Sequence, residues 1–228
     1  MDPLRYADVT QALQQFLGEL DSPDSTGRKR LRILEAATEL FIRQGYRRTS
    51  VDQIARCAGV AKGTVYLYFK TKAELLLYAV GIEKKRYVEA IQPILDGDMP
   101  PRERLRAYLR RAVELITQMP LTSRLMGGDR EVLAVFDDLD ADVRSAHDAM
   151  QIEFLCRLLD PAAAPHRWTV EELRDRARVV LSLMYAFEFM LDERIRRDIS
   201  VDRFAGVLAD IVVDGLCRPK TEGGGKRS

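Results

Sequence analysis

Hydrophobic residues recur at helical spacing along almost the whole chain, and no segment alternates with the period of two that is typical of a β-strand. In residues 28–44, for example, apolar side chains from Ile33 to Phe41 fall on one stripe. Gly45 follows directly, as a glycine often does just past the last turn of a helix. The pattern predicts an all-α fold, with helices over residues 28–44, 50–57, 61–68, 71–94, 101–119, 130–137, 140–159, 169–197 and 200–217.

The same pattern predicts how the chain is organised. We expect an N-terminal helical extension over residues 1–26, a small head over 27–75, a larger helical body over 76–218 and a disordered tail over 219–228. The extension carries an apolar stripe that fits packing on the body as well as covering the head, and the sequence leaves both open. The stripe consists of Val9, Leu13, Phe16, Leu17 and Leu20.

Residues 50–69 contain two short helices joined by a tight turn. Ala55 lies where the helices would cross, and Gly59 falls at the turn, where a positive φ is needed. Ile54, Val60 and Val65 form the apolar wedge between the helices. An ordinary helical hairpin would explain the alanine and the glycine but not a polar, basic second helix. The spacing therefore indicates a helix-turn-helix.

The charge of the chain is distributed unevenly. The net charge is only +1, but eleven basic and three acidic residues lie between Arg28 and Lys72, a net charge of +8. The remainder of the chain is therefore acidic, at about −7. A basic segment on an acidic body is typical of a protein that meets a polyanion at one end, although a solvated charged face is the simpler alternative.

The segment "ILEAATELFIRQGYRRTSVDQIARCAGVAKGTVYLYFKTKAELL" resembles the DNA-binding head of the tetracycline-repressor (TetR) family of bacterial regulators. The motifs agree in order and spacing from residue 28 to about residue 77. The resemblance implies a homodimer, commonly a repressor, that releases its operator DNA when a small ligand enters the body. This chain departs from the family in having Leu67 where many members carry a second tyrosine, and in the length of its N-terminal extension.

The resemblance also implies which residues contact DNA. Hydroxyl groups at the start of the first motif helix would hold a phosphate, and the opening residues of the second helix would face base edges. The tyrosines would line the groove wall, and the lysines at the next helix would meet backbone phosphates. The expected contacts are Thr49, Ser50, Ala61, Lys62, Gly63, Thr64, Tyr66, Tyr68, Lys70 and Lys72.

The last two predicted helices are more apolar than one packing face requires. In the family this pair forms a four-helix bundle with its symmetry mate, which implies a near-palindromic operator. Burial of both faces within one subunit is the alternative. The expected interface residues are Val179, Leu183, Ala205, Gly206, Leu208, Ala209, Ile211, Val212 and Leu216.

Methionine and aromatic residues are frequent in the predicted body, and a pliable lining of this kind suits an apolar or amphipathic ligand. Each of these side chains could equally be plain core. The candidate ligand-binding residues, including two polar ones that could orient a ligand, are Tyr108, Met119, Met126, His147, Met150, Phe154, Met184, Tyr185 and Glu188.

Several other functions find no support in the sequence. The three cysteines and two histidines lack metal-ligand spacing, and no catalytic or cofactor-binding motif is present, so we expect no metal, no cofactor and no enzymatic activity. No apolar run is long enough to span a membrane, and we expect a cytoplasmic protein. A ligand-responsive dimeric transcriptional repressor is the leading hypothesis. A recombinase-like enzyme anchored by the head and a helical scaffold are the alternatives.

Overall fold

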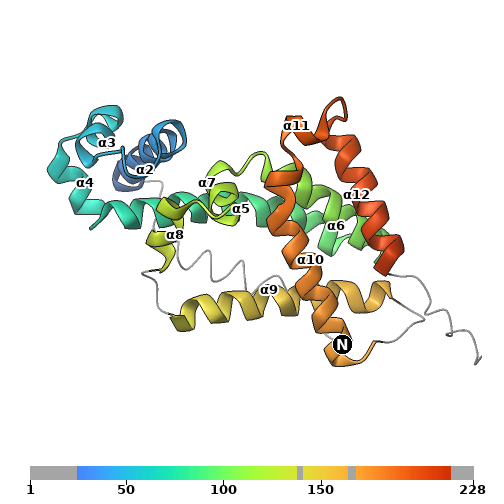
Figure 1. Cartoon of the computed structure of the whole chain (residues 1–228). Helices are drawn as coiled ribbons and strands as arrows, with labels where there is room; N and C mark the ends of the chain where they lie inside the picture. The colour runs from blue at the N-terminus through green and yellow to red at the C-terminus, as the bar shows by residue number, and fades with distance from the viewer. Residues whose placement is uncertain (1–24, 138–140, 164–167, 217–228) are drawn as a thin grey trace, which may run out of the picture. The chain divides into compact units, whose positions relative to one another are not determined.

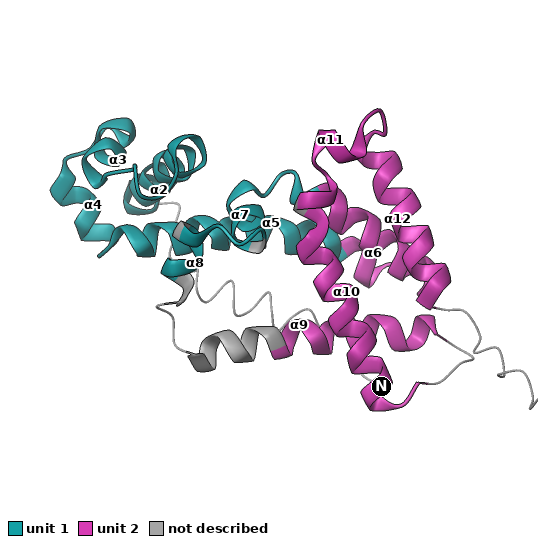
Figure 2. Ribbon diagram, viewed as in Figure 1, with its two compact units in different colours: residues 1–92, 115–144 teal, residues 93–114, 145–228 magenta. Residues whose placement is uncertain are grey.

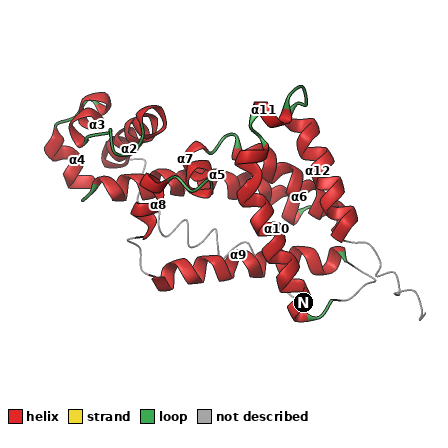
Figure 3. Cartoon of the chain, viewed as in Figure 1, coloured by secondary structure: helices red, strands yellow, loops and turns green. Residues whose placement is uncertain are grey.

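The computed structural model describes residues 25–137, 141–163 and 168–216, and every regular element in these ranges is an α-helix (Figures 1 and 3). The predicted all-α fold is confirmed. The predicted tail and all but the last two residues of the predicted N-terminal extension lie outside the described residues. The helices are α2 (Ser25–Gln44), α3 (Val51–Ala58), α4 (Lys62–Tyr68), α5 (Lys72–Asp96), α6 (Pro101–Ile116), α7 (Pro120–Met126), α8 (Arg130–Asp137), α9 (Ala141–Ala162), α10 (Val170–Met190), α11 (Glu193–Arg196) and α12 (Val201–Leu216).

Two helix predictions were wrong. A single helix was expected over residues 169–197, but α10 ends at Met190 and Asp192 begins the separate short helix α11. The Asp192 carboxylate accepts hydrogen bonds from the side chain and backbone N–H of Arg194, which lower its pKa to about 2. The helix α7 was missed because Pro120 was taken only as the end of the preceding helix, whereas proline also suits the first turn of a new one.

The chain forms two compact units (Figure 2). Unit 1 comprises residues 1–92 and 115–144, and unit 2 comprises residues 93–114 and 145–228. The predicted boundary between residues 75 and 76 does not coincide with this division, because α5 supplies side chains on both sides of that point to the core of the head. Leu75, Leu76, Ala79 and Val80 are all buried there.

The core of unit 1 joins the head to residues that follow much later in the sequence. Phe41 and Phe69 are each 1% exposed, as expected of core residues of the head. Leu121 of α7 and Val132 and Val135 of α8 belong to the same apolar cluster. The head is therefore packed as one body with α7 and α8, which sequence spacing did not reveal.

A buried carboxylate holds the start of α7. Glu83 on α5 accepts hydrogen bonds from the backbone N–H groups of Leu121 (3.1 Å) and Thr122 (2.7 Å). These are donors that a helix N-terminus otherwise leaves unpaired, and a negative charge is favourable at that end of a helix. Burial raises the pKa of Glu83 above its usual value, and the two backbone hydrogen bonds oppose this rise.

The opposite side of α7 holds the end of α2. The Arg124 guanidinium donates to the carbonyl oxygens of Phe41 (3.0 Å) and Ile42 (2.8 Å). Both carbonyls lie in the last turn of α2, where a helix end leaves oxygens short of partners, and the Phe41 oxygen also accepts from the N–H of Gly45 (3.1 Å). Glu83 and Arg124 together make α7 a bridge between α5 and α2 within unit 1.

The turn between α3 and α4 depends on Gly59. Its φ is 63° and its ψ is 41°, the left-handed conformation expected at this position. The N–H of the next residue, Val60, donates to the carbonyl oxygen of Ala55 (3.0 Å), and Ala55 is buried at 3% exposure. A Cβ atom on Gly59 would lie 3.0 Å from a guanidinium nitrogen of Arg32, which donates to the carbonyl oxygen of Ala58.

Replacing this glycine should destabilise the fold, while replacing a glycine only four residues later should not. We expect Gly59→Ala to lower the free energy of unfolding by about 1–2 kcal/mol, because a left-handed conformation is strained for alanine. Gly63 lies inside α4 with open space around a new methyl group, so Gly63→Ala should raise the free energy of unfolding by about 0.5–1 kcal/mol. Urea unfolding measures both values. Equal effects of the two variants would contradict the assigned role of Gly59.

Candidate nucleic-acid interface

The first motif helix, α3, begins with a capping box. The Ser50 hydroxyl accepts from the N–H of Gln53 (3.2 Å), and the Gln53 side chain accepts from the N–H of Ser50 (2.8 Å). A serine followed by a glutamine three residues later is the sequence signature of this motif. Ser50 is exposed and remains at the surface expected to meet a phosphate.

Thr49 is not a surface residue, and its prediction as a phosphate contact is wrong. Its side chain is 1% exposed. The hydroxyl donates to the carbonyl oxygen of Gly45 (2.8 Å) and accepts from the amide of Gln44 (3.2 Å). Thr49 therefore fixes the loop between α2 and α3 from the inside, where a ligand cannot reach its oxygen.

The second motif helix, α4, buries Val65, packs Tyr68 partly against the head core and exposes its opposite face. Val65 is 1% exposed and packs in the head core. The other predicted contacts from the start of α4 to the start of α5 are exposed or half-buried. The exposed ones are Ala61, Lys62, Gly63, Tyr66 and Lys70, and the half-buried ones are Thr64 and Tyr68.

Lys62 is paired across the motif. Its ammonium group lies 2.8 Å from a carboxylate oxygen of Asp52 on α3, and both side chains are about half exposed. The hydrogen bond and the charge of Asp52 raise the pKa of Lys62. Because solvent screens an exposed ion pair and makes it worth little, the lysine can exchange Asp52 for a base edge or a phosphate at small cost.

Lys72 has a structural role that the sequence did not reveal. Its ammonium donates to the carbonyl oxygens of Tyr46 (2.8 Å) and Thr49 (2.9 Å) and lies 4.2 Å from the centre of the Tyr46 ring. An ammonium has three donors and the two carbonyl oxygens take two of them, so the predicted phosphate contact of Lys72 stays a prediction beside this structural role. Lys72 ties the loop before α3 to the first turn of α5.

Arg30 was counted in the sequence only as part of the basic segment, but it is buried at 8% exposure. Its guanidinium lies 5.4 Å from the ring centre of Phe69 and 5.1 Å from that of Tyr78, and donates to the Tyr78 hydroxyl (3.0 Å). Stacking of arginine on aromatic rings is favourable when water is excluded. Arg30 therefore helps to hold α2 against α5. In the sequence, only the position of Arg30 in the first half of α2, beside apolar residues, indicated that its side chain could be buried.

The predicted ligand-binding residues are only partly brought together. In unit 2, Tyr108 and Phe154 meet edge to face with ring centres 5.4 Å apart, and the Tyr108 hydroxyl lies 3.8 Å from the sulfur of Met184. Met150 is half-buried, and Tyr185 is exposed rather than internal. Met119 is buried in unit 1. The side chains of Met126, His147 and Glu188 lie outside the described residues.

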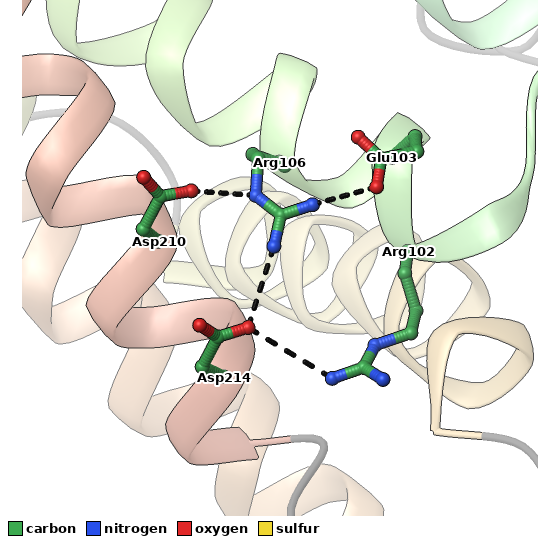
Figure 4. Close-up of polar contacts among 5 residues, drawn as sticks. All are labelled: Arg102, Glu103, Arg106, Asp210 and Asp214. Carbon is green, nitrogen blue, oxygen red and sulfur yellow. Dashed lines mark hydrogen bonds and ion pairs between the residues drawn. The ribbon is translucent and has the colours of Figure 1, made fainter.

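A groove of about 500 Å³ in unit 2 runs between α6 and α12, and charged side chains dominate it. Arg106 donates to Asp210 (2.6 Å), Glu103 (2.8 Å) and Asp214 (3.3 Å), as Figure 4 shows. Arg102 lies 3.9 Å from Asp214. Six of the nine residues that line the groove are charged, and none of the predicted ligand-binding residues is among them.

The residues of the predicted dimer interface fall into three sets by exposure. Val179 on α10 and Ile211 on α12 are exposed, at 57% and 65%, while Ala205 and Ala209 are buried within the protomer at 0% and 1%. The two alanines therefore pack inside the subunit and not in a seam between copies, which corrects their assignment. The half-buried members are Leu183, Gly206, Leu208, Val212 and Leu216. The sequence missed Phe189, which is 73% exposed.

The sequence also predicted neither a metal site nor a membrane-spanning helix. No group of three side chains suited to holding a metal ion gathers in the described part of the chain. Within the same residues, none of the helices combines the length and the apolar character that crossing a bilayer requires.

Residues 33–79 match the family model for bacterial regulatory proteins of the tetR family. A fatty acid metabolism regulator protein of Bacillus subtilis is 31% identical over 88 residues, which cover 39% of this chain and 45% of that protein. The chain spans about half the length of the curated relatives it matches.

Solved structures match over a larger share of the fold. A TetR-like transcriptional regulator from Rhodococcus sp. RHA1 is 27% identical, covers 82% of this chain and 95% of its own, and has a TM-score of 0.59. The transcriptional regulator FadR from Bacillus subtilis, solved in complex with stearoyl-CoA, is 17% identical, covers 81% and 98%, and has a TM-score of 0.62. At this identity the second match shows the fold alone.

The names of these relatives describe regulators and not enzymes. The matched segment, residues 33–79, contains the capping box of α3, the left-handed turn at Gly59 and the exposed face of α4. The head of this chain, over residues 33–79, therefore belongs to the tetR family of bacterial regulatory proteins.

Proposed function

We propose that the protein is a dimeric, ligand-responsive transcriptional regulator, most simply a repressor, whose helix α4 enters the major groove of operator DNA. The observation that carries the proposal is the outward face of α4, which is exposed while Val65 on the opposite side anchors the helix in the core. A helix presented in this way, between basic flanks, suits base recognition with phosphate contacts on either side.

The internal contacts of the head support this assignment. The helices α3 and α4 have eight and seven residues, and isolated helices of this length are unstable in water. Lys72 and Arg30 fix them to the longer helices α5 and α2. The reading helix is thus held in place before DNA arrives, which reduces the entropy lost on binding.

DNA selection from random duplexes, followed by two lysine variants, tests the proposal. We expect Lys62→Ala to weaken binding to the best selected site by about 1–3 kcal/mol and to relax the sequence preference, because it removes a base contact. Lys70→Ala is the matched control. It should weaken binding to all sequences about equally and reduce the salt dependence by about one counterion. Equal losses on selected and random DNA for both variants would contradict the role of Lys62.

Dimerisation is proposed through the exposed apolar side chains of α10 and α12. Val179, Phe189, Val207 and Ile211 are each more than half exposed. An apolar patch on a protein in water marks an interaction site, so these exposed side chains on two helices of unit 2 are the candidates for one. A second copy is the partner that the proposed function requires, because two reading helices must reach successive major grooves about 34–36 Å apart.

Ile211→Arg should convert the dimer to a monomer with weak DNA binding. Position 211 is 65% exposed in the protomer, so the substitution spares folding, but a closed seam would bury an unpaired charge. Leu31→Arg, at an exposed apolar position on α2, is the control and should leave the dimer intact. Sedimentation velocity distinguishes the two species. A persistent dimer in the Ile211 variant would place the interface elsewhere.

The effector is proposed to be an apolar or amphipathic small molecule. Tyr108, Phe154 and Met184 support this class, since they gather aromatic and thioether groups in unit 2. The relatives suggest acyl-coenzyme A thioesters as the first amphipathic compounds to test, because one related structure contains stearoyl-CoA and one relative is named a fatty acid metabolism regulator. Within unit 1, the bridge made by α7 would carry a displacement of α5 to the end of α2.

A ligand that stabilises the protein should lower its affinity for the selected operator. A coupling free energy of about 1–3 kcal/mol would change operator affinity roughly 5–150-fold, and operator would oppose ligand binding by the same factor. Thermal shift with acyl-coenzyme A thioesters of increasing chain length, followed by operator titration, measures both effects. Compounds that stabilise the protein and leave operator affinity unchanged would contradict the induction mechanism but not the proposed DNA binding.

A further inference from the structure

Leu67, on the proposed reading helix, is 78% exposed, the highest value among the exposed large apolar side chains of the described residues. Leaving a leucine in water forgoes the stabilisation that burial would give, and none of the described residues of unit 1 covers this one. An apolar group in this position is unexpected on a helix that meets a highly charged polymer. An apolar partner within the reach of α4 would recover that stabilisation.

The geometry of α4 places Leu67 at the centre of its outward face. A helix turns by about 100° per residue, so Gly63 and Leu67 lie roughly 160° and 200° around the axis from the buried Val65. The more polar Thr64 and Tyr66 lie on either side of this line. The part of α4 that points most directly away from the core is thus formed by a glycine and a leucine.

Gly63 leaves this face bare. A Cβ atom at Gly63 would have no neighbour within 4 Å, so no side chain from elsewhere in the described residues fills the space. In an α-helix, residues four apart lie on the same face and side chains tilt towards the N-terminus, which directs Leu67 over the turn that contains Gly63. A surface that meets α4 there can approach the backbone closely and contact the leucine methyl groups.

We propose that Leu67 is a specificity-determining residue that recognises the C5-methyl group of a thymine in the major groove, with Gly63 allowing the close approach. The inference rests on the proposed DNA-binding function. Base edges in the major groove offer hydrogen-bonding groups and one apolar group, the thymine methyl. Leucine cannot bond a phosphate or a polar base edge, so the methyl group is the partner that fits its chemistry.

The neighbouring charges favour DNA over an apolar protein surface as the partner. Lys62 at the start of α4 and Lys70 just beyond its end are both exposed. They flank Leu67 with positive charge on the same short segment, and a polyanion satisfies these charges while a dry apolar interface would bury them. Contact with one methyl group is worth about a fourfold change in affinity, using the transfer free energy of one buried CH₂ unit.

The test uses the duplex selected from random DNA, with each thymine replaced in turn by deoxyuridine, which lacks only the methyl group. Wild-type protein should lose affinity about fourfold at one thymine in each half-site and be unaffected at positions outside the site. Leu67→Ala should bind the unmodified duplex about as weakly as wild type binds the substituted one, and should no longer sense the substitution. Leu31→Ala, an exposed leucine on α2, is the matched control and should keep the wild-type response.

Two results would overturn the inference. Wild-type protein that is indifferent to the loss of every thymine methyl excludes the contact, and a Leu67→Ala variant that still senses the same methyl assigns it to another residue. Thermal unfolding of the variant checks that an exposed substitution leaves the fold intact. If selection enriches no sequence at all, both the proposed DNA-binding function and the role of Leu67 are refuted. A selected duplex without methyl sensitivity refutes only the role of Leu67.

Discussion

The left-handed turn at Gly59 is the constraint on which the head depends. It lets the N–H of Val60 return to the carbonyl oxygen of Ala55, and this contact fixes the direction in which α4 leaves α3. Only a small residue at position 55 permits the two helices to meet closely at the crossing, and only a residue without Cβ adopts this turn without strain. With that angle set, burial of Val65 and the partial burial of Tyr68 determine which face of α4 points outward.

Basic residues serve two distinct purposes in unit 1. Those at the surface suit a polyanion, whereas Arg30, Lys72 and Arg124 donate to aromatic groups and backbone carbonyls inside the unit. Lys72 and Arg124 add side-chain donors to carbonyl oxygens at a helix end and in a loop, and Arg30 donates to the Tyr78 hydroxyl. Short helices that cannot persist alone thereby become a rigid reading surface. Because some of the basic residues are used inside the unit, the net charge of the segment is larger than the positive charge that remains available for DNA.

Unit 2 separates its polar and apolar contacts. Between α6 and α12, Arg106 is surrounded by three carboxylates, and Arg110 pairs with Asp202 and Glu114 (Figure 4 shows the Arg106 group). Exposed pairs of this kind add little stability individually, but they specify which faces of two helices meet. The apolar residues of α10 and α12 that this arrangement leaves exposed are available for a second copy, as the proposed dimer requires.

The sequence by itself determined the all-α fold, the helix-turn-helix, the capping box of α3 and the glycine turn, since each depends on residues within a few positions of one another. Periodicity and capping act over one or two helical turns, so they are visible in a single stretch of chain. The break between α10 and α11 shows the limit even of local reasoning, because the apolar pattern continued across Asp192 while the side chain capped a new helix.

Only the tertiary structure decided which side chains were free to act. Thr49, Lys72 and Ala205 have residue types suited to a surface contact, yet neighbours distant in sequence or in other elements enclose them. Conversely, Leu67 and Phe189 have residue types suited to a core and are exposed. The physical reason is that burial and hydrogen-bond satisfaction belong to the packed arrangement of helices, in which Glu83 meets residues 38 and 39 positions away, and not to any one segment.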